Sequence, residues 1–376
     1  MKAAKIGVGV VGVGLIGSEL LLQIETEAAR LAACGVDIAV LGLANSRKMH
    51  LASSSAGEVV PTGWKDALAG SAPAADLAAF ADHVKSECAA SGRHPVLVDN
   101  TASDVPPSHY LQWMDKGISV ITPNKRFATG PIADYNQARK LATSTDATFF
   151  YEATVGAGLP LLSTLKTLRA TGDKIVRIEG ILSGTLSYIF NTVTPADNFS
   201  DVVKGAKDQG FTEPDPRDDL SGTDVQRKVT ILARECGMTV ELDDVPVSSL
   251  VPAALSSPDI DAAAFLERLP EFDAEFSQRI KDADARGEVL RFVGVVDPVA
   301  GKCSVELQSY PKSHPFASLQ GADNIVQFQT SRYSKESPLL VRGPGAGAAV
   351  TAMGVFGDLL QVANHKGSPE LWRGPE

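Results

Sequence analysis

The sequence contains few cysteines, and their spacing fits neither a disulfide framework nor a metal site. Cys34, Cys88, Cys236 and Cys303 lie far apart in the chain, and no CxxC pair is present. Structural zinc sites need closely spaced ligands, and small secreted domains held by disulfides need many more cysteines. We therefore expect reduced, buried thiols in a cytoplasmic protein.

Long apolar runs and basic clusters are also missing. No stretch reaches the roughly 18 apolar residues that a membrane span needs. The basic residues 1–5 lead into a glycine-rich apolar run, which predicts a buried first strand rather than a signal peptide. The formal net charge is −10, from 35 Lys and Arg against 45 Asp and Glu, without a Lys/Arg-rich run. We expect no membrane partner and no nucleic-acid partner.

A glycine motif, GVGLIG at residues 12–17, follows an apolar strand at residues 5–11 and precedes a helix at about 18–34. In this setting the first glycine permits a tight turn, the second lets the backbone approach a pyrophosphate, and the third lets the helix pack on the strand. The amides at the helix start would hold the phosphates, although a turn without a ligand is the alternative. The predicted phosphate site consists of Gly12, Gly14, Leu15, Ile16 and Gly17.

The end of the second predicted strand, at residues 37–43, indicates which dinucleotide binds. NAD sites usually place a carboxylate there for the ribose hydroxyls, whereas this chain has Asn45, Ser46, Arg47 and Lys48. Two cations without a carboxylate favour a 2′-phosphate. The pattern predicts NADP, bound by Asn45, Arg47 and Lys48. NAD stays open, and a solvated basic turn is the alternative.

The distribution of strands and helices predicts an α/β protein with two domains, since 376 residues exceed one ordinary core. Up to residue 150, strands and helices alternate, as in a Rossmann-type dinucleotide-binding domain with a parallel sheet. Strands with one polar face, such as 174–182, predict an antiparallel α+β domain at 151–335, with helices at 250–285. A strand and an apolar helix within 336–376 should return to the first domain.

Two lysines are candidates for proton transfer. Lys125 ends the sequence TPNK, at the carboxyl end of a predicted strand, where open α/β sheets bind ligands. Lys228 follows Asp224 by four residues and flanks an apolar helical stripe. A partly desolvated lysine beside a carboxylate suits proton transfer. The alternatives are a solvated loop lysine for Lys125, and for Lys228 an ordinary ion pair worth about 0.3–0.5 kcal/mol or a capping box that begins at Ser221.

Two glycine-rich segments lie near the expected domain boundaries. Residues 151–160 mark the first crossover, and residues 343–347 precede the final apolar helix, predicted at 348–362. Backbone amides at the start of that helix could face a ligand, with Gly345 as the candidate residue. Close packing of backbone is the alternative.

Seven motifs occur in the order found in the homoserine dehydrogenase family, which the chain resembles over essentially its whole length: GVGLIG, VDNTASD, TPNKR, EATVGAGLP, GILSGTLSYIFN, GFTEPDPRDDLSGTDVQRK and GPGAGAAVTA. The fifth and sixth motifs are the most specific, while the first ones fit many Rossmann enzymes. The resemblance implies that Lys228, with Asp224 beside it, transfers the proton and that Lys125 is a second essential lysine.

The resemblance also implies roles for other positions. The implied substrate-binding residues are Glu213, Asp219 and Thr185. Those implied around the nicotinamide and active site are Asn100, Thr101, Ser183 and Gly345. Backbone carbonyls implied to hold sodium belong to Glu152, Val155, Ala157 and Leu159, where Ala157 replaces a residue that is often glycine.

The activity implied by the resemblance is NAD(P)-dependent interconversion of L-homoserine and L-aspartate 4-semialdehyde, in threonine, methionine and isoleucine biosynthesis. The second domain would then be catalytic and would form a homodimer. The chain resembles the short fungal form, with neither an ACT domain nor an aspartokinase, so we expect no dedicated threonine site. The alternatives are a relative that acts on another amino-acid aldehyde or alcohol, and a NADP-sensing regulatory protein without turnover.

Overall fold

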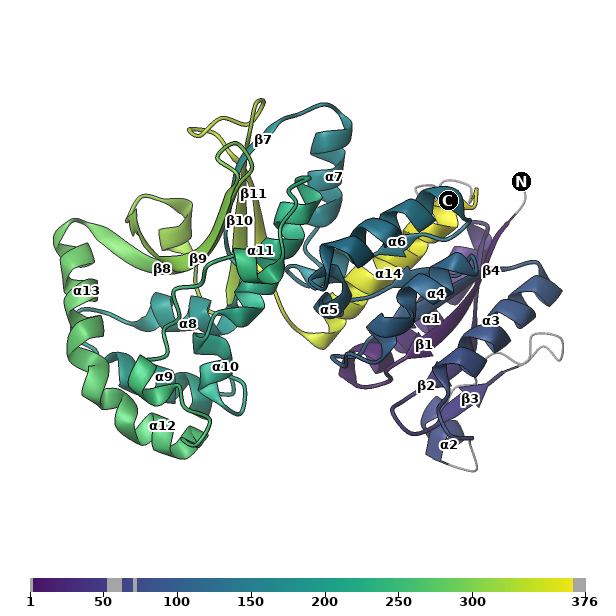
Figure 1. Cartoon of the computed structure of the whole chain (residues 1–376), viewed down its shortest axis with the longest axis horizontal. Coiled ribbons are helices and arrows are strands. Elements are labelled where there is room, and N and C mark those ends of the chain that lie inside the picture. The colour runs from purple at the N-terminus through teal and green to yellow at the C-terminus, as the bar shows by residue number, and fades with distance from the viewer. Residues whose placement is uncertain (1–2, 53–62, 70–72, 368–376) are drawn as a thin grey trace. The chain divides into compact units, whose positions relative to one another are not determined.

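The computed structural model describes residues 3–52, 63–69 and 73–367. The chain forms two compact units (Figure 1). The first comprises Met1–Gly158 and Gly347–Glu376, and the second comprises Leu159–Ala346. Within the described residues, none of the helices combines the length and apolar composition needed to cross a lipid bilayer.

The first unit is built on a six-stranded sheet of order β3-β2-β1-β4-β5-β6. Its strands are parallel except β3, which is antiparallel to β2. The central strands are almost entirely buried, as in a parallel sheet that is covered on both faces. The strands are β1 (Ala4–Val11), β2 (Val36–Ala44), β3 (Met49–Leu51), β4 (His94–Asp99), β5 (Ser119–Ile121) and β6 (Phe149–Phe150).

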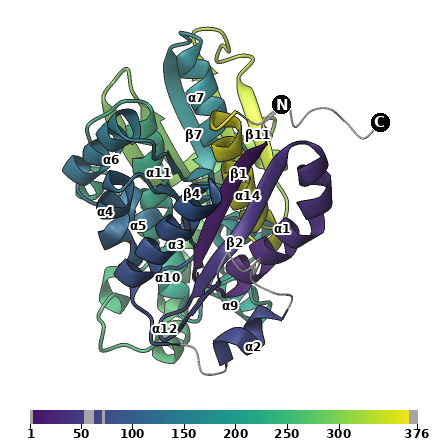
Figure 2. The same ribbon diagram turned by 90° about the vertical axis from the view of Figure 1, so that its right-hand side faces the viewer.

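Helices cover both faces of this sheet. One apolar core joins it to α1 and α14, and the other joins it to α3, α4 and α6. Figure 2 shows α14, from the far end of the chain, beside α1 and β1. The expected return of the final helix is therefore confirmed. The helices of this unit are α1 (Leu15–Ala33), α2 (Trp64–Ala69), α3 (Leu77–Ser91), η1 (Pro106–His109), α4 (Tyr110–Asp115), α5 (Lys125–Ala128), α6 (Ile132–Ser144), η2 (Glu152–Thr154) and α14 (Ala348–His365).

The second unit contains a five-stranded sheet of order β11-β10-β7-β8-β9. All of its pairings are antiparallel, as the period-two pattern predicted. The strands are β7 (Ile175–Ile181), β8 (Glu288–Asp297), β9 (Lys302–Pro311), β10 (Asp323–Thr330) and β11 (Leu339–Pro344).

Helix α11 packs closely on this sheet because β8 has a glycine beneath it. A Cβ atom on Gly294 would lie 2.4 Å from Cγ2 of Val229 on α11, so only glycine permits this approach. The helices of this unit are α7 (Leu162–Ala170), α8 (Gly184–Thr192), α9 (Phe199–Asp208), α10 (Pro216–Leu220), α11 (Thr223–Glu235), η3 (Leu242–Asp244), η4 (Ala253–Leu255), α12 (Ala262–Arg268), η5 (Leu269–Phe272), α13 (Asp273–Ala285) and η6 (Pro315–Ser318).

Two expectations differ from the structure. The strand within residues 336–376 does not return to the first unit, because β11 pairs with β10 of the second sheet. The chain re-enters the first unit only at Gly347. The segment 250–285 is not continuously helical, because residues 256–261 lie outside any helix and the 3-10 turn η5 separates α12 from α13. Pro270, which lacks a backbone N–H, lies in the first turn of η5.

Candidate active site

A cleft of about 860 Å³ lies in the first unit, at the carboxyl ends of β1, β2 and β4. It is lined by the glycine turn, the end of β2, helix α2 and the segment after β4. Seven residues expected at the cofactor line it together, although they come from separate parts of the sequence. They are Gly12, Gly14, Asn45, Arg47, Lys48, Asn100 and Thr101.

The glycine turn is tight on one side and open on the other. Gly12 has φ +85°, and a Cβ on Gly17 would lie 2.1 Å from the carbonyl oxygen of Gly12. A Cβ on Gly14 would meet nothing within 4 Å. Helix α1 begins at Leu15 without a side-chain cap, so its first amides, including that of Ile16, can bind an anion.

The basic end of the cleft is shaped by Asn45. Its side-chain oxygen accepts hydrogen bonds from the backbone N–H groups of Arg47 and Lys48, both at 2.8 Å. The Lys48 ammonium donates to the carbonyl of Ala69 at 3.1 Å, and the Arg47 side chain is exposed. Among the described residues that line the cleft there is no carboxylate, which favours an anionic ligand.

Trp64 and Lys65 on α2 also line the cleft, although the sequence did not predict them there. The Lys65 ammonium lies 5.7 Å from the centre of the Trp64 ring. Lys65 adds a third cation to Arg47 and Lys48. Neither residue belongs to a recognisable motif, so the sequence offered no signal for their place in the cleft.

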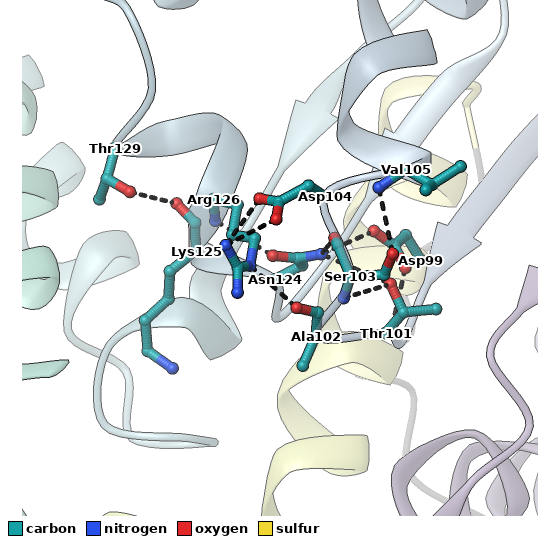
Figure 3. Close-up of polar contacts among 10 residues, drawn as sticks. All are labelled: Asp99, Thr101, Ala102, Ser103, Asp104, Val105, Asn124, Lys125, Arg126 and Thr129. Carbon is teal, nitrogen blue, oxygen red and sulfur yellow. Dashed lines mark hydrogen bonds and ion pairs between the residues drawn. The ribbon is translucent and has the colours of Figure 1, made fainter. Parts of the chain in front are cut away.

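A buried hydrogen-bond network at Asp99, the last residue of β4, fixes the loops that follow β4 and β5 (Figure 3). Asp99 is fully buried. One carboxylate oxygen accepts from the Thr101 N–H at 2.8 Å, and the other accepts from the Tyr110 hydroxyl and from Nδ2 of Asn124 at 3.1 Å. Burial raises the pKa of Asp99, and these hydrogen bonds oppose that shift.

Lys125 is held at the start of α5 by its neighbours. Asn124 caps this helix by accepting from the Arg126 N–H at 3.1 Å, and its Nδ2 also donates to the carbonyl of Ser103 at 2.9 Å. Arg126 pairs with both carboxylate oxygens of Asp104 at 2.7 and 2.8 Å. Figure 3 shows the Lys125 side chain extending away from this cluster. Its backbone is therefore fixed while its ammonium points elsewhere.

In the second unit, the buried Lys228 of α11 forms an ion pair with a half-exposed carboxylate. Its ammonium lies 2.7 Å from the Asp224 carboxylate and donates to the carbonyl of Leu182, also at 2.7 Å. Lys228 is 7% exposed, whereas the Asp224 side chain is 49% exposed. The capping box is absent, because Gly222 is the N-cap residue and forms no side-chain cap. The pair thus differs from an ordinary exposed ion pair because its lysine is buried and has a second partner, the carbonyl of Leu182.

Asp219 links the start of α8 to the segment before α10. It accepts from the Thr185 hydroxyl at 2.8 Å and from the Glu213 N–H at 2.8 Å. Burial raises the pKa of Asp219. Ser183 caps α8 by accepting from the Leu186 N–H at 3.2 Å. Asp219 therefore holds the expected substrate residues Thr185 and Glu213, and the Glu213 side chain is exposed.

The residues expected to hold sodium lie around η2 and the crossover between units. The N–H of Glu152 donates to the buried Asp358 of α14 at 2.9 Å. Ala157 has φ +53°, a conformation that favours glycine. Val155 and Ala157 are buried in the first unit, and Leu159 begins the second. Within the described residues no cluster of His, Cys, Asp or Glu side chains suits a metal ion, so a cation here would depend on backbone carbonyls.

Comparison with known proteins identifies the family. Residues 160–360 match the family model for homoserine dehydrogenase, and residues 12–152 match the model for the homoserine dehydrogenase NAD binding domain. The chain belongs to the homoserine dehydrogenase family. The resemblance seen in the sequence motifs is thereby confirmed, and members of this family are oxidoreductases.

Homoserine dehydrogenase relatives occur as long and short chains. The bifunctional aspartokinase/homoserine dehydrogenase 1 of Zea mays is 53% identical over 370 residues, which are 98% of this chain and 40% of that protein. This chain therefore spans about 40% of the length of the plant relatives. The homoserine dehydrogenase of Schizosaccharomyces pombe is 44% identical over 363 residues, covering 95% of both chains.

Solved structures show the same fold. A Candida auris protein of unknown function has a TM-score of 0.87 and 40% identity, covering 96% of this chain and 98% of that one. A hyperthermophilic archaeal homoserine dehydrogenase, solved in complex with NADPH, has a TM-score of 0.70 and 22% identity, covering 97% and 100%. At that identity the likeness shows the fold alone.

Proposed function

We propose that this chain is an NAD(P)-dependent homoserine dehydrogenase, which interconverts L-homoserine and L-aspartate 4-semialdehyde in threonine, methionine and isoleucine biosynthesis. The observation that carries the proposal is Lys228, a buried ammonium held between Asp224 and the carbonyl of Leu182. Two fixed partners orient this ammonium, as a proton donor requires. Family membership supplies the reaction type.

The cleft in the first unit fits a dinucleotide. Both amide atoms of Asn100 are buried and have no hydrogen-bond partner among the described residues, so a ligand can supply the bonds that a buried amide requires. Gly14 opens the glycine turn to phosphate. We propose that Arg47 and Lys48 bind the 2′-phosphate of NADP, and that Thr101, Ser183 and Gly345 belong to the nicotinamide side.

The residues of this chain would handle the proton and orient the substrate. When bound, the nicotinamide exchanges a hydride at its C4 with the substrate carbon that bears the reacting oxygen. Lys228 gives a proton to that oxygen in the reducing direction and takes one back in the oxidising direction, while Asp224 holds its ammonium. A general acid or base of this kind accelerates a reaction by about 10²–10⁴-fold. Lys125 would be the second essential lysine.

The substrate's ammonium would meet acidic residues around α10. Glu213 presents an exposed carboxylate, and Asp224 is half-exposed. The Asp219 carboxylate accepts hydrogen bonds from the Thr185 hydroxyl and from the backbone N–H of Glu213. We therefore propose that Asp219 shapes this side of the site by fixing Thr185 and Glu213.

Three further features complete the proposal. The carbonyls of Glu152, Val155, Ala157 and Leu159 would bind sodium. The second unit would form a homodimer. Light scattering during gel filtration tests this, and a monomer at micromolar concentration would contradict it. All four cysteines are free thiols, which fits the expected reducing cytoplasm.

The decisive experiment follows the absorbance of the reduced cofactor with L-homoserine and NADP or NAD, and with L-serine as the control substrate. We expect reduction that depends on homoserine and is faster with NADP. Cofactor binding without turnover would support a NADP-sensing regulatory protein instead. Turnover only with another amino-acid alcohol would replace homoserine as the substrate.

A further inference from the structure

Asn324, the second residue of β10, is a buried amide without hydrogen bonds. The residue is fully buried, and neither Nδ2 nor Oδ1 has a partner among the described residues. A side-chain amide offers two donors and an acceptor, and native proteins rarely leave both atoms unsatisfied. Asn100 shares this property and lines the cofactor cleft. An amide that is unsatisfied at both atoms requires a physical explanation, such as a ligand-bound state in which its hydrogen bonds form.

The amide of Asn324 lies directly against the glycine-rich segment at residues 343–346. A Cβ atom on Gly345 would lie 2.0 Å from Nδ2 and 2.5 Å from Oδ1 of Asn324. Strand pairing holds the two segments side by side, because Asn324 lies opposite Gly343 on β11. Only glycine at position 345 leaves room for the amide, so Asn324 and Gly345 form a matched pair.

The other neighbour of Asn324 is the strand that anchors the proton-transfer lysine. Ile325 pairs with Ile181 of β7, so Asn324 comes to the level of Leu182, whose carbonyl accepts from Lys228. Asn324 therefore lies between the glycine-rich segment and the anchor of Lys228, all within the second unit.

We infer that Asn324 is a positioning residue that forms hydrogen bonds to the backbone of the 343–346 segment when ligands bind. The inference rests on the proposed function, which assigns Gly345 to the cofactor. The amide of Asn324 touches the segment and forms no hydrogen bond to it. A small shift of the segment on ligand binding would bring a backbone N–H and C=O to the amide. Part of the ligand's binding energy would then come from satisfying Asn324.

Asn324→Leu tests this inference, because leucine has a similar size and cannot form these bonds. We expect kcat/KM for homoserine to fall roughly tenfold or more, and the rise in Tm on adding NADP to shrink. The Tm of the protein alone should stay level or increase, since a buried unpaired amide has been removed.

Gln329→Leu, at an odd position of the same strand and so on the opposite sheet face, is the matched control. A purely structural role would instead lower Tm and activity together.

A double-mutant cycle tests the matched pair independently. Gly345→Ala alone should impair ligand binding, because its Cβ overlaps the amide. In an Asn324→Ala background the same change should cost much less, because the added methyl group has room.

The outcomes separate the two proposals. Asn324→Leu with kcat/KM within about twofold of wild type, a parallel loss of Tm and activity, or strict additivity in the cycle would overturn the role of Asn324. Wild-type protein that binds NADP but does not oxidise homoserine would overturn the proposed function, and this inference with it.

Discussion

The ammonium of Lys228 lies 2.7 Å from the carboxylate of Asp224, one helical turn earlier on α11, and equally close to the carbonyl of Leu182, which directly follows β7. The first contact is local and the second joins the helix to the end of β7. Together, the two contacts fix the direction of the buried ammonium.

Lys228→Ala should lower turnover by about 10²–10⁴-fold while the affinity for NADP changes little, because proton transfer is lost and the cofactor cleft is untouched. Steady-state kinetics and a cofactor titration measure the two effects. Lys204→Ala is the matched control, since Lys204 forms an i,i+4 pair with Asp208 at 3.0 Å on an exposed surface. Near-normal turnover of Lys228→Ala would reduce Lys228 to a helix ion-pair partner.

Arg47→Ala should weaken the binding of NADP far more than that of NAD. Adding Lys48→Ala should enlarge this difference in affinity. The reason is that the described lining of the cleft offers cations and no carboxylate to a 2′-phosphate. Dissociation constants for both dinucleotides measure this. The single variant is needed because Lys48 also bonds to Ala69 of α2. Equal losses for both dinucleotides would show that these side chains do not contact the phosphate.

Gly14→Ala and Gly17→Ala should separate binding from folding. A Cβ at Gly14 meets nothing, so stability should hold while NADP affinity falls, because the methyl group occupies the ligand's space. A Cβ at Gly17 would overlap the carbonyl of Gly12, which should cost about 1–3 kcal/mol or more of unfolding free energy. Urea unfolding and cofactor titration give both quantities. Unchanged NADP affinity in Gly14→Ala would argue against a phosphate at this turn.

Tyr110→Phe should destabilise the protein more at neutral than at acidic pH. The folded protein keeps the Asp99 proton to higher pH than the unfolded chain, so stability falls as pH rises from the ordinary pKa of 3.8 toward the raised value. The hydrogen bond from the Tyr110 hydroxyl lowers the pKa of Asp99. Removing this hydroxyl therefore raises the pKa further and extends the loss of stability to higher pH. Urea midpoints at about pH 4 and about pH 7 test this.

Tyr135→Phe is the control for this pH dependence, because its hydroxyl bonds to Tyr151 and Arg139. Its loss of stability should be similar at both pH values. If Tyr110→Phe also lost the same amount at both, Asp99 would not titrate in this range.

The sequence predicted those parts of the site that depend on local spacing. The glycine turn between strand and helix, the basic end of β2 and the Asp224–Lys228 pair each follow from residues within one turn or motif. The alternation of strands and helices likewise predicted the parallel sheet, and the period-two pattern within a strand predicted the antiparallel one. These features form because neighbours along the chain determine them.

Other parts depend on contacts between distant segments, which the sequence alone could not give. The hydrogen bond from Lys228 to Leu182 joins residues 46 positions apart in the sequence. Gly345 contacts Asn324 only because β11 pairs with β10. Trp64 reaches the cleft through the packing of α2. Helix α9 was not predicted, although its buried residues Phe199, Val203 and Ala206 recur at helical spacing.

Helix α14 completes a core whose other buried residues all lie within the first 153 residues of the chain. Its residues Val355, Leu359 and Val362 pack with α1 and β1, which are synthesised hundreds of residues earlier. During translation this face of the first sheet is therefore only partly covered, chiefly by α1, until α14 emerges from the ribosome. We expect nascent chains that stop before Ala348 to recruit chaperones and to resist final folding, so that cofactor binding becomes a late, post-translational event.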